Sequence, residues 1–212
     1  MIMYYKKYIK IRHYIREIGI ICIITGLIRK KRLKRLQMKY CFDSWHLYPI
    51  EHRSYATWIV NYINSRINVD NTAVEIGCGL GEIINSIKCK NKCGYDICDK
   101  VISAANELFI HHLTRFEIGT FKDVNNLNID YLIVVNFTAM IDPITLKAEF
   151  KNICKNNRIH RVVVESVNAT GYTYCHDFSN ILPENFIVEN ESKVFYPLKR
   201  IIWVYKNSDL SE

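Results

Sequence analysis

The sequence VEIGCGLGEII, residues 74–84, places Gly77, Gly79 and Gly81 at alternate positions. The chain has only 8 glycines in 212 residues, so this short stretch is unusual. A β-branched run precedes the glycines and an apolar pattern of helical period follows them, which predicts a strand, a tight turn and a helix. Glycine in such a turn either adopts a backbone conformation that other residues avoid or lets the backbone approach a bulky group.

Strand and helix patterns alternate on both sides of this turn. We expect strands at 72–77, 93–97, 115–120, 131–137 and 161–167, and helices at 51–67, 81–87, 99–112 and 143–156. Two more extended runs, 186–195 and 200–206, follow with a short connection and predict an antiparallel pair. The expected fold class is therefore α/β: a Rossmann-like three-layer sandwich with a mostly parallel sheet and a terminal antiparallel strand pair.

The positive charge of the chain is concentrated near its N-terminus. Residues 1–40 hold twelve Lys and Arg and one acid, a net charge of +11, whereas residues 41–212 hold seventeen Lys and Arg and twenty acids, a net charge of −3. We therefore divide the chain into a basic amphipathic helical arm, 1–40, and a globular domain, 41–212. A mildly acidic domain disfavours a long phosphate-binding surface, so we do not expect nucleic acid as the partner.

The arm has the pattern of a helix that lies on a surface. Apolar side chains recur at three- and four-residue steps from Tyr4 to Cys22, mostly opposite the basic ones. The apolar stretch 18–28 then has 11 residues, whereas a spanning helix needs about 20. We expect residues 1–35 to bind a membrane surface, with Lys and Arg at anionic headgroups. The alternatives are packing on a partner subunit or on the body of the protein, and an electrostatic clamp on nucleic acid.

The eight cysteines predict reduced thiols rather than a disulfide framework. Cys89, Cys93 and Cys98 cluster, but they lack the paired C-x2-C spacing of a zinc site and have no histidine nearby. We therefore expect no metal site. No cleavable signal peptide is evident, which predicts a cytoplasmic protein, peripheral at the inner face of the membrane if the arm binds there.

Ligands of open α/β sheets bind beyond the carboxyl ends of the strands. The glycine turn would place backbone N–H groups and a helix N-terminus there, and Asp96 ends the next strand, where a carboxylate can bind ribose hydroxyls. The G-x-G-x-G spacing differs from the G-x-G-x-x-G of dinucleotide sites. With Glu75 two residues before the first glycine, VEIGCGLG resembles motif I of the class I S-adenosylmethionine-dependent methyltransferases. GYDICDKVISAA, residues 94–105, is similar to that family's second-strand segment.

This resemblance implies an enzyme, a methyltransferase with S-adenosylmethionine as its cofactor. The three glycines would surround the methionine part of the cofactor, and Glu75 would hold its amino end. Asp96 would accept hydrogen bonds from the ribose hydroxyls, with Ile97 against the adenine. Many relatives have an acid after the third strand that contacts the adenine amino group, whereas Thr120 or Phe121 occupies that position here. The implied cofactor-binding residues are Glu75, Gly77, Gly79, Gly81, Asp96, Ile97, Thr120 and Asn136.

Polar residues near the ends of the fourth and fifth strands, and in the segment before the first strand, are candidates for the acceptor side. They are Asn136, Asp142, Glu165, His176, Asp177, Trp45 and His46. A hydroxyl acceptor needs a general base, and we select His46, Glu165 and His176 as catalytic candidates. Trp45 beside His46 would suit a sugar ring and its hydroxyl. Each candidate also has a structural alternative: a cap, an ion pair with an arginine, an exposed loop position, or a contact that holds the loop to the core.

The class of methyl acceptor is predicted from one sequence motif that is absent and from one segment that resembles known enzymes. The fourth strand ends VVNFTAMID, residues 134–142, which lacks the N-P-P-Y type signature of base-amino methyltransferases. FDSWHLYPIEHRSYA, residues 42–56, is similar to small methyltransferases from bacterial surface-polysaccharide clusters. We expect O-methylation of a sugar in a surface polysaccharide or lipid-linked glycan. A membrane-tethered non-catalytic scaffold subunit and a nucleic-acid methyltransferase are the alternatives, and the sequence predicts no oligomeric state.

Overall fold

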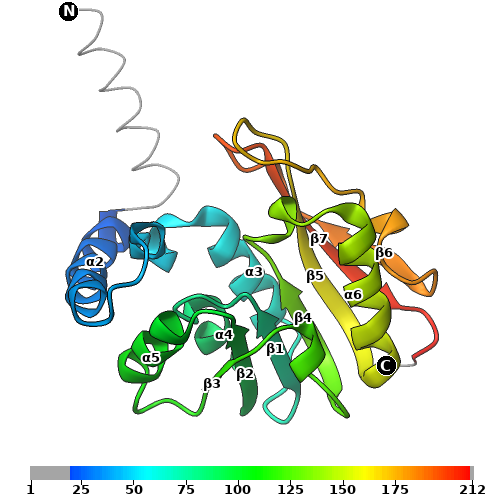
Figure 1. Cartoon of the computed structure of the whole chain (residues 1–212), viewed down its shortest axis with the longest axis horizontal. Coiled ribbons are helices and arrows are strands. Elements are labelled where there is room, and N and C mark those ends of the chain that lie inside the picture. The colour runs from blue at the N-terminus through cyan, green and yellow to red at the C-terminus, as the bar shows by residue number, and fades with distance from the viewer. Residues whose placement is uncertain (1–19, 211–212) are drawn as a thin grey trace, which may run out of the picture.

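The structure, a computed structural model, describes residues 20–210. Helix α2 (Ile20–Tyr40) leads into the 3-10 helices η1 (Ser44–Leu47) and η2 (Ile50–His52) and then into α3 (Ser54–Asn64). The alternating part of the chain follows (Figure 1). Its elements are β1 (Thr72–Ile76), α4 (Glu82–Ser86), β2 (Asn91–Asp96), α5 (Asp99–Leu108), β3 (Arg115–Ile118), η3 (Phe121–Asp123), β4 (Asn128–Val134), η4 (Thr138–Met140), α6 (Pro143–Asn156), β5 (Arg158–Val167), η5 (Phe178–Asn180), β6 (Phe186–Glu191) and β7 (Arg200–Asn207).

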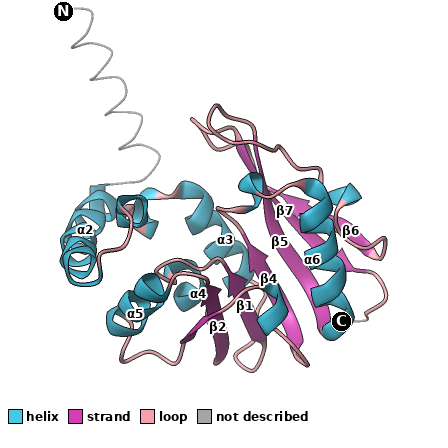
Figure 2. Cartoon of the chain, viewed as in Figure 1, coloured by secondary structure: helices cyan, strands magenta, loops and turns pink. Residues whose placement is uncertain are grey.

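The strands form one sheet with the order β3-β2-β1-β4-β5-β7-β6. Strands β1 to β5 pair in parallel, and β7 lies between β5 and β6 and is antiparallel to both. The predicted α/β class, the mostly parallel sheet and the terminal antiparallel pair are therefore confirmed (Figure 2). Because the chain goes outward from β1 to β3 and then returns to β4 on the other side of β1, the order reverses between β1 and β4. Such a reversal is where open sheets form a ligand crevice.

Helices cover both faces of the sheet, and the core has a layer on each face. In one layer, α3, α4 and α5 pack on the sheet with buried side chains such as Ile59, Ile84 and Ala105. The other gathers α6 and η5 through residues such as Phe150 and Phe178. The run Leu132–Val135 is completely buried, as expected for a central strand enclosed on both faces.

Several expected boundaries differ from the structure by a few residues, and the largest difference precedes β1. The helix predicted at 51–67 is shorter, because Arg53 has a non-helical backbone (φ −111°, ψ 86°) that separates η2 from α3. The segment between α2 and α3 contains η1 and η2. These two turns hold aromatic and basic side chains against the end of the sheet, where the site described below is built.

The second half of the predicted arm packs on the domain. Leu33 and Leu36 of α2 are buried in the core, and Arg32 donates from Nη2 to the carbonyl oxygen of Leu108 at 2.8 Å. Within residues 20–210, no helix combines the length and hydrophobicity needed to cross a membrane. The amphipathic pattern was predicted from Tyr4 to Cys22, and its residues 4–19 lie outside the described part of the chain.

Candidate active site

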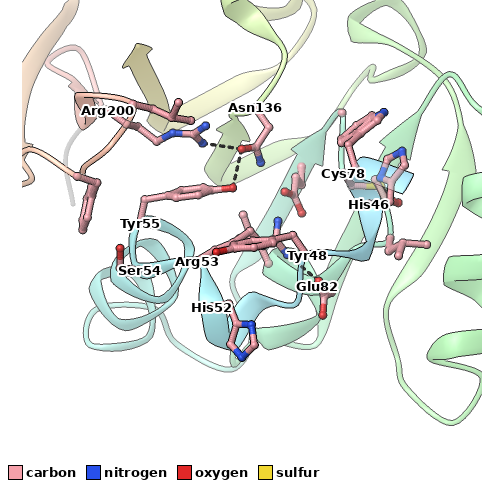
Figure 3. A pocket seen from close by; sticks show the side chains of 18 of the residues that line it. His46, Tyr48, His52, Arg53, Ser54, Tyr55, Cys78, Glu82, Asn136 and Arg200 are labelled. Atoms are coloured by element: carbon pink, nitrogen blue, oxygen red, sulfur yellow. Dashed lines mark hydrogen bonds and ion pairs between the residues drawn. The ribbon is translucent and has the colours of Figure 1, made fainter. Parts of the chain in front are cut away.

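A cavity of about 450 Å³ lies beyond the carboxyl ends of β1 and β4, where the strand order reverses. Its volume is in the range of small-molecule sites, about 300–1,000 Å³. The wall is formed by the glycine turn after β1, the segment from η1 to the start of α3, and residues after β4, after β5 and around the start of β7 (Figure 3). The lining includes Trp45, His46, Tyr48, His52, Arg53, Tyr55, Glu75, Gly77, Gly79, Glu82, Asn136, Tyr172, Tyr196 and Arg200.

The glycine turn has both properties for which glycine is needed: an unusual backbone conformation and a close approach to bulky side chains. Gly77, Gly79 and Gly81 have φ values of +69°, +54° and +72°, in the left-handed region that side chains disfavour. A Cβ atom at Gly77 would overlap the ring of Phe137, and one at Gly81 would overlap the ring of Phe116. The bare backbone is therefore required by conformation and by packing, and it leaves main-chain atoms of Gly77 and Gly79 at the cavity wall.

Asp96 fastens this turn to the end of β2. Its Oδ2 accepts a hydrogen bond from Gly79 N at 2.9 Å, and its Oδ1 accepts one from Cys98 N at 3.0 Å. Each carboxylate oxygen can accept a further hydrogen bond. Ile97, the next residue, is 76% exposed, so an apolar surface lies beside the carboxylate.

Helix η1 lies over the turn. The imidazole of His46 is close to Gly79, with Nδ1 3.1 Å from the place of a Cβ there. Trp45 stacks on His46 with ring centroids 3.5 Å apart and is itself 65% exposed. Burial lowers the pKa of His46 to about 4, although the charge of Asp96 opposes this shift. His46 is therefore neutral at pH 7. It lines the cavity, whereas Asp96 does not.

Glu75 and Arg53 are two of the ionisable groups that line the cavity beside the turn. Burial raises the pKa of Glu75 to about 8, although Oε2 accepts a hydrogen bond from Ile84 N at 3.0 Å. Arg53 donates from Nη2 to Glu82 Oε2 at 2.7 Å, while its buried Nε has no partner among the described residues. A buried donor without a partner is costly, so the Nε–H of Arg53 is suited to a bound anionic group.

A hydrogen-bond network holds Asn136 at the opposite wall. Asn136 has φ +78°, and its Oδ1 accepts from Tyr55 Oη at 2.7 Å and from Arg200 Nη1 at 2.6 Å. Since both partners donate, the amide oxygen faces them and the amide nitrogen turns away (Figure 3). Arg200 also pairs with Glu165, with Nη1 and Oε2 2.6 Å apart, and stacks on the ring of Tyr55.

The structure places several predicted residues away from the cavity. Glu165 is 1% exposed and forms an ion pair with Arg200, which was the structural alternative to a catalytic role. His176 is buried, with Nε2 2.8 Å from the carbonyl oxygen of Thr138. Thr120 forms a capping box with Asp123. Asp142 and Asp177 cap α6 and η5. Of the three candidate bases, His46 alone lines the cavity.

Several residues that line the cavity were not selected as candidates in the sequence analysis. They are Arg53, Tyr55, Tyr172, Tyr196 and Arg200. Arg53 lies in the quoted segment 42–56 and could have been selected as an anion ligand. Arg200 could not, because only the insertion of β7 beside β5 brings it to Asn136.

Comparison with solved structures gives the fold. The chain matches the N-methyltransferase NodS from Bradyrhizobium japonicum WM9 in complex with S-adenosyl-L-homocysteine, with a TM-score of 0.66, 16% identity, and coverage of 83% of this chain and 98% of that one. The protein has the fold of the S-adenosylmethionine-dependent methyltransferases. Magnesium protoporphyrin IX methyltransferase (ChlM) from Synechocystis PCC 6803, with S-adenosylhomocysteine bound, matches with a TM-score of 0.63, 14% identity, and coverage of 91% and 100%.

A third match with this methyltransferase fold is an S-adenosylmethionine-dependent methyltransferase from Clostridium acetobutylicum ATCC 824. Its TM-score is 0.57, with 14% identity and coverage of 72% of this chain and 90% of that one. No protein-family profile and no curated protein sequence matches the chain. Among residues 20–210, no group of three or more His, Cys, Asp or Glu side chains is arranged to hold a metal ion. The seven cysteines from Cys41 to Cys175 are free thiols.

Proposed function

We propose that this protein is an S-adenosylmethionine-dependent methyltransferase that O-methylates a sugar of a surface polysaccharide or lipid-linked glycan. The observation that carries the first part is the bare glycine turn at the reversal point of the sheet, fastened by Asp96. The second part is supported by the aromatic residues of the cavity wall and by the resemblance of residues 42–56. Trp45, Tyr48, Tyr172 and Tyr196 offer apolar ring faces with polar tips, which suit the alternating surface of a sugar.

The residues present fit the proposed cofactor. The turn at Gly77 and Gly79 gives the backbone access that a bulky nucleoside needs, and Asp96 has free lone pairs for ribose hydroxyls. Glu75 would meet the amino end of the methionine part, where a positive charge favours the ionised carboxylate despite burial. The unpartnered Nε–H of Arg53 would bind the carboxylate end.

When bound, the cofactor supplies an activated methyl group for an in-line displacement. The chain's own contribution is then to align the acceptor and exclude water. The amide nitrogen of Asn136 can donate to an acceptor oxygen, because its Oδ1 is already held by Tyr55 and Arg200. His46, neutral at pH 7, has a ring nitrogen able to accept a proton, although a pKa of about 4 makes it a weak base.

Two measurements test this function. Calorimetric titration with S-adenosylhomocysteine should show binding, and no heat at millimolar ligand would contradict the proposal. Incubation with methyl-labelled donor and separated envelope, polysaccharide and RNA fractions should label the polysaccharide or envelope pool. Cofactor binding with no label in any fraction would favour the non-catalytic scaffold, and label in RNA would favour the nucleic-acid enzyme.

Arg53→Met should weaken S-adenosylhomocysteine binding by about ten-fold to 100-fold, because a hydrogen bond to a charged group contributes about 1.5–3 kcal/mol. Calorimetry measures the change. Arg66→Met is the matched control, since Arg66 packs on the ring of Tyr62 outside the cavity. Equal affinity of the wild type and Arg53→Met would remove Arg53 from the cofactor site.

Cofactor binding should also change the fluorescence of Trp45. Trp45 and His46 line the cavity, and His46 lies against Gly79, whose N–H is bonded to Asp96. A ligand that reaches from the cavity to Asp96 should therefore contact this stack. Titration with S-adenosylhomocysteine should alter the tryptophan emission, and Trp45→Phe should abolish the change while Trp58 and Trp203 remain. A change of emission in Trp45→Phe as large as that in the wild type would show that the signal does not come from η1.

A further inference from the structure

Helix α2 has two faces of opposite chemistry. Its inner face, with Gly26, Leu33 and Leu36, is buried against the domain. On the opposite side, residues follow one another at three- and four-residue steps, so they share one face of the helix. We call this set the outer face of α2: Ile21, Ile24, Leu27, Ile28, Lys31, Lys34, Arg35 and Met38.

The outer face changes from apolar to basic along its length. Ile21, Ile24, Leu27 and Ile28 are 78%, 54%, 54% and 66% exposed, and they form a contiguous apolar patch over about two helical turns. Lys31, Lys34 and Arg35 come next and are exposed as well. A single exposed isoleucine needs no explanation, whereas a contiguous patch of four branched residues beside a basic cluster marks a binding surface.

The helix is fixed to the domain by its inner face and flank. Arg29 Nε lies 2.9 Å from Glu51 Oε1, and Tyr40 Oη donates to Glu107 Oε2 at 2.6 Å. Together with the buried Leu33 and Leu36, these contacts hold the helix from its middle to its C-terminal end. Whatever covers the outer face therefore also sets the orientation of the whole domain.

We propose that the outer face of α2 is a docking surface for an anionic lipid bilayer. The isoleucines and leucine would enter the boundary between headgroups and acyl chains, and the Lys and Arg side chains would lie at anionic headgroups. A second copy of the chain fits poorly, because two outer faces would bring like charges together. Nucleic acid fits poorly too, because a polyanion offers nothing to the four apolar side chains.

This docking holds the cavity close to the bilayer, on the inner side of α2 and about one helix diameter, 10–12 Å, from its outer face. His52 lines the cavity, its ring lies against Gly26 of α2, and its Nε2 is 3.4 Å from the carbonyl oxygen of Ile23. Tyr48, 50% exposed, also lines the cavity next to His52, with ring centroids 6.0 Å apart. The methyl acceptor would therefore be a membrane-bound molecule, such as a lipid-linked glycan. This last step alone rests on the proposed function.

The test measures sedimentation of the full chain with phosphatidylcholine vesicles and with vesicles that also contain phosphatidylglycerol. The outer-face variant is Ile21→Ser with Ile24→Ser and Ile28→Ser. Its matched control is Ile110→Ser with Leu113→Ser and Ile144→Ser, which are 70%, 75% and 83% exposed elsewhere on the molecule. We expect the wild type and the control to bind anionic vesicles, and the outer-face variant to bind at least ten-fold more weakly.

Charge reversal on the outer face is the second part of the test. Lys31→Glu with Lys34→Glu and Arg35→Glu should lower binding to anionic vesicles at least ten-fold, and high salt should release the wild type. The matched control reverses the exposed Lys147, Lys151 and Lys155 of α6 and should change binding at most two- to three-fold. Circular dichroism confirms that each variant is folded.

Three results would overturn the proposal. They are a wild type that binds neither kind of vesicle, an outer-face variant that binds as well as its control, and a loss confined to self-association in light scattering or to RNA binding. Because vesicle binding is measured without methyl transfer, these results are distinct from a failure to bind S-adenosylhomocysteine, which concerns the proposed function.

Discussion

Replacing Arg200 by alanine should lower the free energy of unfolding by about 3–5 kcal/mol, because it leaves a buried charge without its partner. Glu165 is 1% exposed and lies 2.6 Å from Arg200 Nη1. Arg200 also holds Asn136 at φ +78° and stacks on Tyr55, so the cavity wall loses its support as well. Urea unfolding at pH 7 measures the change.

Two controls separate the buried charge from a general loss of packing. Glu165→Gln added to Arg200→Ala should recover part of the stability, since the amide carries no charge. Arg158→Ala, at an exposed arginine, should change stability by less than about 0.5 kcal/mol. A loss below about 1 kcal/mol in Arg200→Ala would show that the ion pair is not the support of this wall.

The pH dependence of the Arg200→Ala variant has a definite sign. Burial raises the pKa of Glu165 in the folded protein, and the charge of Arg200 opposes that shift. Without Arg200 the folded state binds a proton more readily than the unfolded state. The variant's stability defect should therefore shrink as the pH falls from 7 to 5.

Asp96→Ala should weaken S-adenosylhomocysteine binding by at least about 100-fold, because two charge-assisted hydrogen bonds of about 1.5–3 kcal/mol each would be lost. The substitution also frees Gly79 N and Cys98 N, which the carboxylate now holds. The turn would lose its attachment to β2 in the same step. Isothermal calorimetry measures the affinity.

Asp99→Ala is the matched control, because Asp99 is an exposed acid in the first turn of α5, three residues away. It should leave the affinity within about three-fold, whereas Asp96→Asn should fall between the two, since the amide oxygen can still accept one hydrogen bond. If Asp96→Ala bound the ligand as tightly as Asp99→Ala, the nucleoside would lie elsewhere.

The fold class followed from local patterns, which depend on neighbours along the chain. Glycines at alternate positions after a β-branched run predicted the turn, and all three have positive φ. The apolar run at 131–137 predicted a strand enclosed on both faces. Residues 131–135 are buried, whereas Asn136 and Phe137 follow the end of β4 and are partly exposed. Asp96 was predicted at the end of a strand and lies there, bonded to the turn.

The catalytic candidates depended on non-local packing and were less predictable. Glu165 and His176 were selected because strand ends gather at one edge of a sheet, but pairing with Arg200 and with the carbonyl oxygen of Thr138 buries them outside the cavity. Tyr55 and Arg200 are 145 positions apart and meet at Asn136 only when β7 inserts beside β5.

The amino-acid sequence by itself determined the order of strands and helices, the glycine turn and the carboxylate after the second strand, because each arises from backbone preferences and periodicity over a few residues. Only the tertiary structure decided which side chains line the cavity and which face of α2 is exposed. The physical reason is that burial and charge pairing depend on contacts between elements that are far apart in the sequence, and a local sequence pattern does not specify those contacts.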